Sequence, residues 1–196
     1  MKKSHCSLGV LLAGFALLIS GCATTTDYVT LSYIPQANAM RIDGANNVQV
    51  KVVINDQRAV KDRVSAKKDF HGIEIAPIIS MNDVKGAIQG AIEAELRNRG
   101  FNVDSGGTTI ELTVQKFYND FQPGFWTRKA NTDAAFKLKV IASDGSEVLI
   151  KNMSDEWSKP VLHMSAKRAQ LALNKALRES VQSLFHDGEF LGALLK

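Results

Sequence analysis

Residues 82–101 read NDVKGAIQGAIEAELRNRGF and predict the element on which the rest of the fold depends. Asn82 can cap a helix, with Asp83 favourable at its positive end. At the other end, Gly100 permits a left-handed turn that lets Phe101 fold back onto Leu96 in a Schellman-type stop. Between them the apolar residues recur at helical spacing, which predicts one buried helix face: Val84, Ala87, Ile88, Ala91, Ile92 and Leu96.

A second helical pattern begins at Ser165 and is predicted to end near Asp187 and Gly188. Polar residues follow one side of it, and a short apolar tail comes after it at residues 190–195. The pattern predicts a second amphipathic helix. Its buried face consists of Ala166, Ala169, Leu173, Ala176, Leu177, Val181 and Leu184.

Elsewhere apolar residues alternate with polar ones, which is the period of a half-buried strand. The last two strands are joined through residues 143–146, SDGS, a hairpin signal, and the second continues towards Trp157 before Pro160. Residues 61–69 are highly charged and predict a solvated loop. Residues 28–35 predict either an edge strand or an extended segment lying across the domain. The expected strands are 48–54, 73–76, 110–114, 136–140 and 148–150.

The N-terminus has the layout of a secretory signal peptide. Lys2 and Lys3 are followed by an apolar run over residues 6–19, which is shorter than the roughly 18 to 20 residues of a membrane-spanning helix. Residues 18–22, LISGC, resemble a bacterial lipobox, in which the chain is cut between Gly21 and Cys22. The resemblance implies that Cys22 becomes an N-palmitoyl, S-diacylglycerol cysteine. An ordinary cleaved signal with an incidental cysteine is the alternative.

The residue after the cysteine bears on location. It is Ala23 and not aspartate, which by resemblance to sorting in enteric-type bacteria favours the outer membrane over retention in the inner membrane. The domain is then expected to face the periplasm. Three regions follow: a signal peptide at 1–21, a lipidated tether and edge segment at 22–47, and one lipoprotein domain at 48–196.

The order strand, strand, helix, three strands, helix predicts an α+β fold. Hairpin-joined strands and helices with a single apolar stripe indicate an antiparallel or mixed β-sheet with the two helices packed on one face. The sequence shows no internal repeat and no second domain.

Charge and cysteine content exclude several functions. The formal charge of +4 includes Lys2 and Lys3, so 22 basic residues against 20 acidic ones leave +2 in the mature chain. That balance gives no support for nucleic acid binding. Cys6 is lost with the signal and Cys22 is acylated, so the mature domain has no disulfide and no thiolate for catalysis or metal binding.

No residue set predicts catalysis, and we expect no enzyme activity, metal or cofactor. His71, His163 and His186 are far apart in the sequence and lack a second ligand at metal spacing. Asp56 and Arg58 could pair or hold a turn.

The aromatic segment over residues 121–128, FQPGFWTR, is the candidate binding site. Its loop character is predicted by Pro123 and Gly124, and aromatic and arginine side chains are common at interface hot spots. The candidate residues are Phe121, Phe125, Trp126 and Arg128. The alternative is that these rings cover the end of the core.

As a whole the chain resembles the YajG family of bacterial lipoproteins. The likeness is carried by the lipobox, the strand that ends in residues 55–58 (NDQR), the helix that ends in residues 96–103 (LRNRGFNV), the strand at 110–114 running into Phe117, and the last helix running to His186. The resemblance implies an envelope lipoprotein with no catalytic residues to map.

Two functions are therefore predicted. The first is a non-enzymatic accessory or adaptor lipoprotein that is anchored to the membrane and binds an envelope protein. The second is a lipid- or glycan-binding lipoprotein with a groove near the aromatic segment. The oligomeric state is left open.

Overall fold

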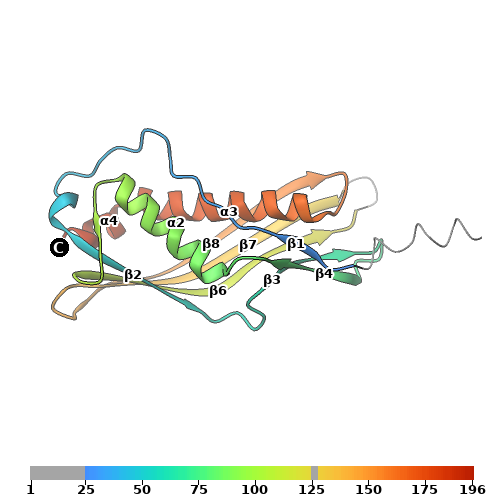
Figure 1. Cartoon of the computed structure of the whole chain (residues 1–196), viewed down its shortest axis with the longest axis horizontal. Coiled ribbons are helices and arrows are strands. Elements are labelled where there is room, and N and C mark those ends of the chain that lie inside the picture. The colour runs from blue at the N-terminus through green and yellow to red at the C-terminus, as the bar shows by residue number, and fades with distance from the viewer. Residues whose placement is uncertain (1–24, 125–127) are drawn as a thin grey trace, which may run out of the picture.

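A computed structural model describes residues 25–124 and 128–196, so the predicted signal peptide and Cys22 lie outside the described residues. The described strands form one eight-stranded mixed sheet. Its longest members are β6 (Thr108–Gln122), β7 (Arg128–Ile141) and β8 (Glu147–Val161), and β7 pairs antiparallel with both of its neighbours (Figure 1). These three strands give the sheet its length.

The other side of β6 is shared by two strands that lie end to end. β2 (Gln49–Asp56) runs parallel to the first half of β6, and β3 (Arg63–Lys68) reaches its second half through the pair Ser65 and Asn119. Outside them lie three further strands, β5 (Asn102–Val103) beside β2, β4 (Glu74–Ser80) beside β3, and β1 (Asp27–Val29) on the edge beside β4.

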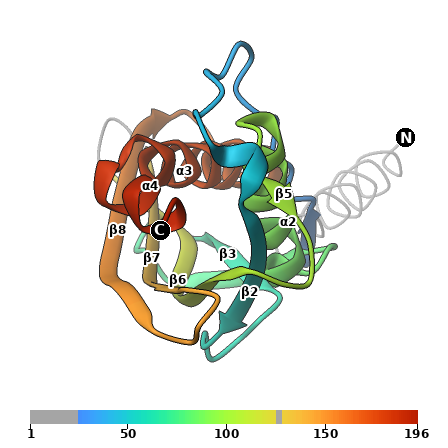
Figure 2. The same cartoon turned by 90° about the vertical axis from the view of Figure 1, so that its left-hand side faces the viewer.

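The helices cover one face of the sheet. α2 (Val84–Asn98) contacts β2, and α3 (Ala166–His186) contacts β6, β7 and β8. The sheet curves around these helices, as the end-on view shows (Figure 2). Two shorter helices complete the described chain: the 3-10 turn η2 (Ala45–Asn47) and α4 (Gly188–Leu194). The predicted α+β fold with two amphipathic helices on one face is confirmed.

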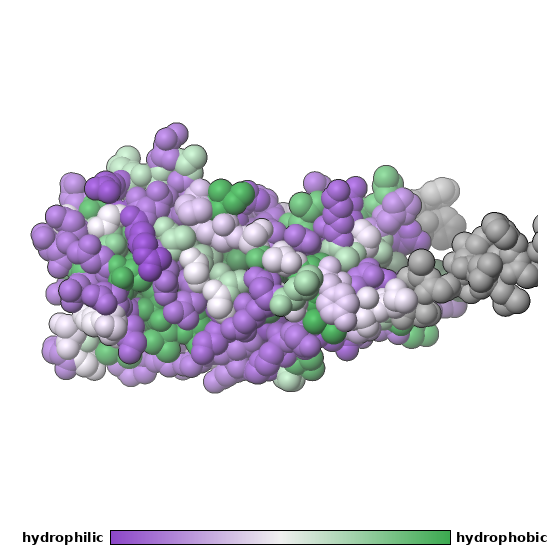
Figure 3. Space-filling model, in the orientation of Figure 1, coloured by the Kyte–Doolittle hydropathy of each residue, from purple (hydrophilic) through white to green (hydrophobic). Residues whose placement is uncertain are grey.

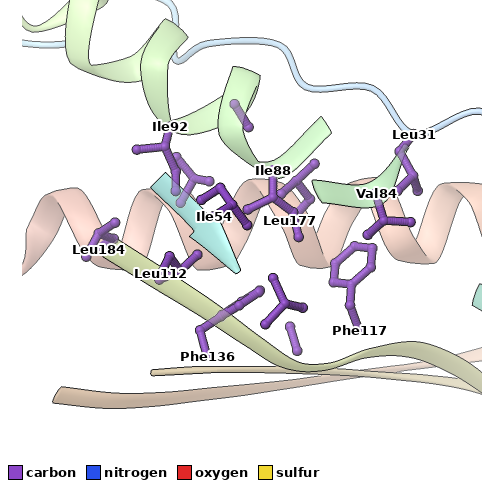
Figure 4. Close-up of a cluster of buried hydrophobic side chains, with 14 of the residues drawn as sticks. Leu31, Ile54, Val84, Ile88, Ile92, Leu112, Phe117, Phe136, Leu177 and Leu184 are labelled. Carbon is purple, nitrogen blue, oxygen red and sulfur yellow. The ribbon is translucent and has the colours of Figure 1, made fainter. Parts of the chain in front are cut away.

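The core fills the space between the helices and the sheet. α2 points Val84, Ile88 and Ile92 towards the sheet, as the periodicity predicts (Figure 4). They meet buried side chains from β2, β6, β7 and α3, namely Ile54, Leu112, Phe117, Phe136, Leu177 and Leu184. Large fully buried side chains of this kind each stabilise the fold by roughly 1.5 to 3 kcal/mol relative to an exposed position.

The two ends of α2 differ in how well the sequence predicted them. At the C-terminus, the amides of Gly100 and Phe101 bond the carbonyls of Arg97 and Leu96, which confirms the Schellman stop. At the N-terminus the cap is Asp83, whose carboxylate accepts from the amides two and three residues on. The prediction of Asn82 as the cap is wrong.

Asn82 instead fixes the N-terminal segment. Its amide accepts a 2.9 Å bond from the main-chain N–H of Leu31 and donates a 3.0 Å bond to the Leu31 carbonyl. Residues 27–29 form the edge strand β1, and the chain then continues as an extended segment. Both interpretations of residues 28–35 are therefore partly right.

Three further predictions are corrected. The charged segment 61–69 contains β3, because Val64 to Ala66 are buried while the ammonium groups of Lys67 and Lys68 reach carboxylates at the surface. The apolar tail is the helix α4, capped by Asp187. β8 continues through Pro160 to Val161, which an edge strand tolerates.

Candidate functional site

The structure places the described residues of the predicted aromatic site in different environments. Phe121 lies in β6 and is fully buried, so it belongs to the core and not to a surface loop. Arg128 begins β7 and donates a 3.0 Å hydrogen bond to the carbonyl of Leu162. Phe125 and Trp126 lie outside the described residues. For Phe121, the alternative that the ring covers the end of the core is correct.

A β-bulge explains why the sequence misplaced Phe121. The pairing of β6 with β7 shifts between Val114 and Lys116, so Gln115 is an extra residue. After it, the buried positions fall on Phe117, Asn119 and Phe121. The alternation of buried and exposed residues changes register at Gln115, and the strand continues to Gln122 instead of ending at the predicted residue 114.

The bulge lies on β6 between the end of its pairing with β2 at Val114 and its pairing with β3 at Asn119. Asp56 and Arg58 occupy this gap between β2 and β3. Arg58 donates to Asp56 through Nε at 3.0 Å and through an Nη at 2.8 Å, and both side chains are 7% exposed. The other Nη donates to the Phe117 carbonyl at 3.4 Å. The guanidinium thus donates a hydrogen bond to β6 between β2 and β3.

The electrostatics of this pair suit a structural role. Burial raises the pKa of Asp56, but hydrogen bonds from Arg58 outweigh burial and leave the pKa below its ordinary value. Asp56 therefore stays ionised at neutral pH and has no proton to donate. The suggestion from sequence that Asp56 and Arg58 pair is confirmed.

A shallow hollow of about 340 Å³ lies beside this pair and is lined by Val60, Arg63, Glu74 and Tyr118 among others. Arg63 forms an ion pair with Glu74, and the Tyr118 hydroxyl donates to Glu74 at 3.2 Å. Burial and then the Glu74 charge raise the pKa of Tyr118 to about 12. The hydroxyl is therefore protonated at neutral pH. Glu74 bonds both Arg63 and Tyr118, while the Nε of Arg63 is buried and has no hydrogen-bond partner among the described residues.

The free edge of the sheet is the feature that the sequence did not predict. β8 is 15 residues long and pairs with β7 alone among the described strands. The strands at the opposite edge, β1 and β5, have only three and two residues. An exposed edge strand presents unpaired main-chain N–H and C=O groups to another chain. Between Lys151 and Lys159 this edge contains no lysine or proline, and its charged side chains are Asp155 and Glu156.

A groove runs between this edge and the C-terminal end of α3. It has a volume of about 390 Å³ and is lined by residues 151–155 of β8 together with Ser183, His186 and Asp187. Inside it, the Oδ2 atom of Asp155 is buried and has no hydrogen-bond partner among the described residues. We call this feature the β8 groove.

Electrostatic contacts close one end of the β8 groove. Lys151 bonds Asp187 at 2.5 Å and Glu189 at 3.2 Å, so β8 is tied to the junction of α3 and α4. The hydrogen bond from Lys151 is the main cause that lowers the pKa of Asp187. His186 is exposed, with Nδ1 2.6 Å from the Gln182 carbonyl.

The interior between sheet and helices offers little space. A cavity near Leu177, Ser180 and Leu184 has a volume of only about 10 Å³, about the least that one water molecule requires. No group of histidine, cysteine, aspartate or glutamate within residues 25–124 and 128–196 is arranged to hold a metal ion. In the same part of the chain no helix is both long and apolar enough to span a membrane.

These features define an α+β domain with one helix-covered face, one open face and one long free edge. The chain belongs to a bacterial lipoprotein family, Lipoprotein_16, whose members are described as uncharacterized lipoproteins and whose model matches residues 35–194. This confirms the resemblance to YajG-type lipoproteins. No curated protein sequence matches the chain significantly.

Two solved structures illustrate what the chain resembles. A protein of Xanthomonas campestris matches with a TM-score of 0.59 at 12% identity, covering 84% of this chain and 96% of its own. A minor lipoprotein of Acinetobacter baumannii matches with a TM-score of 0.46 at 6% identity, covering 72% and 91%. At these identities the first likeness concerns the fold alone, and the second is too weak to carry an argument.

Proposed function

We propose that this protein is a non-enzymatic accessory lipoprotein of the cell envelope that binds a partner protein along β8. Acylated Cys22 holds it in the outer membrane, and the domain faces the periplasm. Membership of a lipoprotein family supports the anchor. The alanine after the cysteine supports the outer membrane.

The free edge of β8 is the observation that carries the adaptor role. An extended segment of a partner can add to such an edge, so that main-chain hydrogen bonds give affinity and alternate side chains give specificity. Every second side chain of the added segment would face the β8 groove. There the carboxylate of Asp155, which lines the groove, favours a hydrogen-bond donor such as lysine, arginine or serine.

Lipid or glycan binding receives less support from the described residues. The cavity between sheet and helices is too small for an acyl chain. Phe121, one of the four residues predicted to form a binding tip, is in the core.

Site-specific photo-crosslinking in cells tests the adaptor role. A photoreactive amino acid is placed at Ser154 or Glu156, both exposed on β8, and at Lys51 as a control, which is exposed on β2. We expect both β8 positions to give the same adduct with one envelope protein, and Lys51 to give none. No adduct on β8, or equal adducts at all three positions, would contradict binding along this edge.

A substitution in the groove sharpens the test. Asp155→Ala removes the unpartnered oxygen without touching the main chain of β8. We expect it to reduce the yield of the Ser154 adduct several-fold, because a donor on the partner loses its acceptor. Asn152→Ala, an exposed position on the same strand, serves as the matched control.

A further inference from the structure

The described chain begins at the end of the domain where β3 and β4 are joined (Figure 1). The carbonyl of Thr25 accepts a 2.9 Å hydrogen bond from Nζ of Lys67, which also pairs with Asp27 at 2.9 Å. Lys67 lies next to the last residue of β3. These contacts hold the start of the described chain beside the β3–β4 turn.

Other chain segments meet at the same end. A side chain placed on Gly72 of the β3–β4 turn would touch Pro123, which follows β6. Arg128 at the start of β7 bonds Leu162 at the end of β8. We call this region the anchor end, defined by the turn at residues 69–73, the facing ends of β7 and β8, and the first turn of α3.

Large apolar side chains are exposed at the anchor end. Phe70 is 77% exposed, Ile73 63% and Leu162 76%. Hydrophobic residues stand among hydrophilic ones in this part of the surface (Figure 3). Single exposed apolar residues are common on proteins, so their position matters more than their number.

The charges of the anchor end favour an anionic partner. Three acidic groups near it already have partners within the domain. Asp27 pairs with Lys67, Asp120 pairs with Lys68, and Asp69 accepts hydrogen bonds from the amides of its own turn. The cations of the anchor end differ, because five of them form no ion pair with a described residue: Arg128, Lys129, Lys159, Lys167 and Arg168.

Chain length places this surface close to a bilayer. Thr25 lies three residue steps after Cys22, and an extended chain covers at most about 11 Å over that distance. Charges interact with a membrane surface over a Debye length of about 8 Å at physiological salt. An acyl group on Cys22 therefore keeps the anchor end within reach of the lipid headgroups.

We propose that the anchor end docks on the bilayer that holds the acyl chains of Cys22. Phe70, Ile73 and Leu162 enter the boundary between headgroups and acyl chains, and the unpaired cations contact anionic headgroups. This inference rests on the lipid anchor of the proposed function and adds an orientation to it. The long strands, roughly 50 Å at about 3.4 Å per residue, stand away from the membrane and carry the β8 groove into the periplasm.

Fluorescence in vesicles tests the docking. The full mature lipidated chain is reconstituted in vesicles of phosphatidylethanolamine and phosphatidylglycerol, with an environment-sensitive fluorophore on Phe70→Cys or Leu162→Cys. Ile150→Cys is the matched control, an exposed apolar residue in the other half of β8. We expect a blue shift and quenching by nitroxide lipids at positions 70 and 162, and neither at 150. Raising the salt to 1 M should weaken the quenching, because the Debye length falls to about 3 Å.

Vesicle flotation separates failure of the docking from failure of the anchor. Protein that floats with the vesicles while position 70 stays unquenched would overturn the docking and leave the anchor intact. Protein that does not float would overturn both. Equal quenching at 70 and 150 would contradict the upright orientation. A blue shift at position 70 that appears only in native membranes, and not in protein-free vesicles, would mean that a protein covers this surface. That result would overturn the lipid contact.

Discussion

The hydroxyl of Tyr33 donates a 2.8 Å hydrogen bond to Glu95, a carboxylate that is completely buried on α2. Glu95 also pairs with Arg99 at 3.1 Å, and the Arg99 guanidinium lies 5.1 Å from the ring centre of Phe185 on α3. The N-terminal segment, α2 and α3 are thus joined through one buried charged cluster. The sequence shows only the four-residue spacing of Glu95 and Arg99 on one helix, because Tyr33 and Phe185 lie far from them along the chain.

Replacing Tyr33 with phenylalanine should destabilise the domain. Tyr33→Phe removes a donor from a buried carboxylate, and we expect it to lower the free energy of unfolding by roughly 1 to 3 kcal/mol. Urea denaturation followed by circular dichroism measures the change. Tyr28→Phe is the control, since Tyr28 is 60% exposed. Equal effects of the two substitutions would show that the bond to Glu95 contributes nothing.

Alkaline pH should destabilise the protein through Tyr118. Burial and Glu74 raise the pKa of Tyr118 from 10.0 to about 12, so the folded state favours the neutral phenol. The stability that this difference in pKa contributes is fully present below about pH 10 and is lost as the pH rises from 10 to 12. Absorbance titration of the phenolate should lose a component near pH 12 in Tyr118→Phe. An unchanged titration would contradict the environment described for Tyr118.

Breaking the Asp56–Arg58 pair should be more costly than breaking an exposed one. Arg58→Met leaves the buried Asp56 carboxylate with only the exposed Lys61 ammonium, 3.8 Å away, as a cationic partner, and we expect a loss of about 3 kcal/mol in unfolding free energy. Arg97→Met is the matched control, because Arg97 pairs with Glu93 on the surface of α2 and is 55% exposed. Such pairs contribute about 0.3 to 0.5 kcal/mol. Similar losses in urea denaturation would contradict a role for Arg58 between β2 and β3.

Acid should remove the stability that Asp56 supplies. Its pKa is lowered from 3.8 in the folded state, so its contribution is present above that value and is lost as the pH falls through and below it. Unfolding free energies measured from pH 6 to pH 2 should fall less steeply in Asp56→Asn than in the natural protein. Parallel curves for the two proteins would show that Asp56 does not titrate with unfolding.

Local patterns predicted the helices and the hairpin because these depend on neighbouring residues. The apolar face of α2, its stop at Gly100 and the turn at residues 143–146 could all be predicted in this way. β3 was missed because only Val64 to Ala66 are buried and charged residues flank them. Its partners lie 54 residues away at Asn119 and on β4.

The candidate site depended on non-local pairing and was harder to predict. The sequence predicted a strand at residues 148–150 that continues towards Trp157, but the place of β8 at the edge is decided by which strands pair elsewhere. The Gln115 bulge reversed the expected orientation of Phe121. Asp56 and Arg58 could be paired from their spacing, whereas the Phe117 carbonyl that Arg58 bonds could not.

Acylation of Cys22 is the central claim about this protein, because the membrane location, the docking of the anchor end and the orientation of β8 all require it. Mass spectrometry of the N-terminal peptide from protein purified out of cell membranes tests it directly. We expect the peptide to begin at Cys22 and to carry a thioether-linked diacylglycerol and an amide-linked acyl chain. A free thiol at Cys22, or a peptide that begins before it, would contradict the claim.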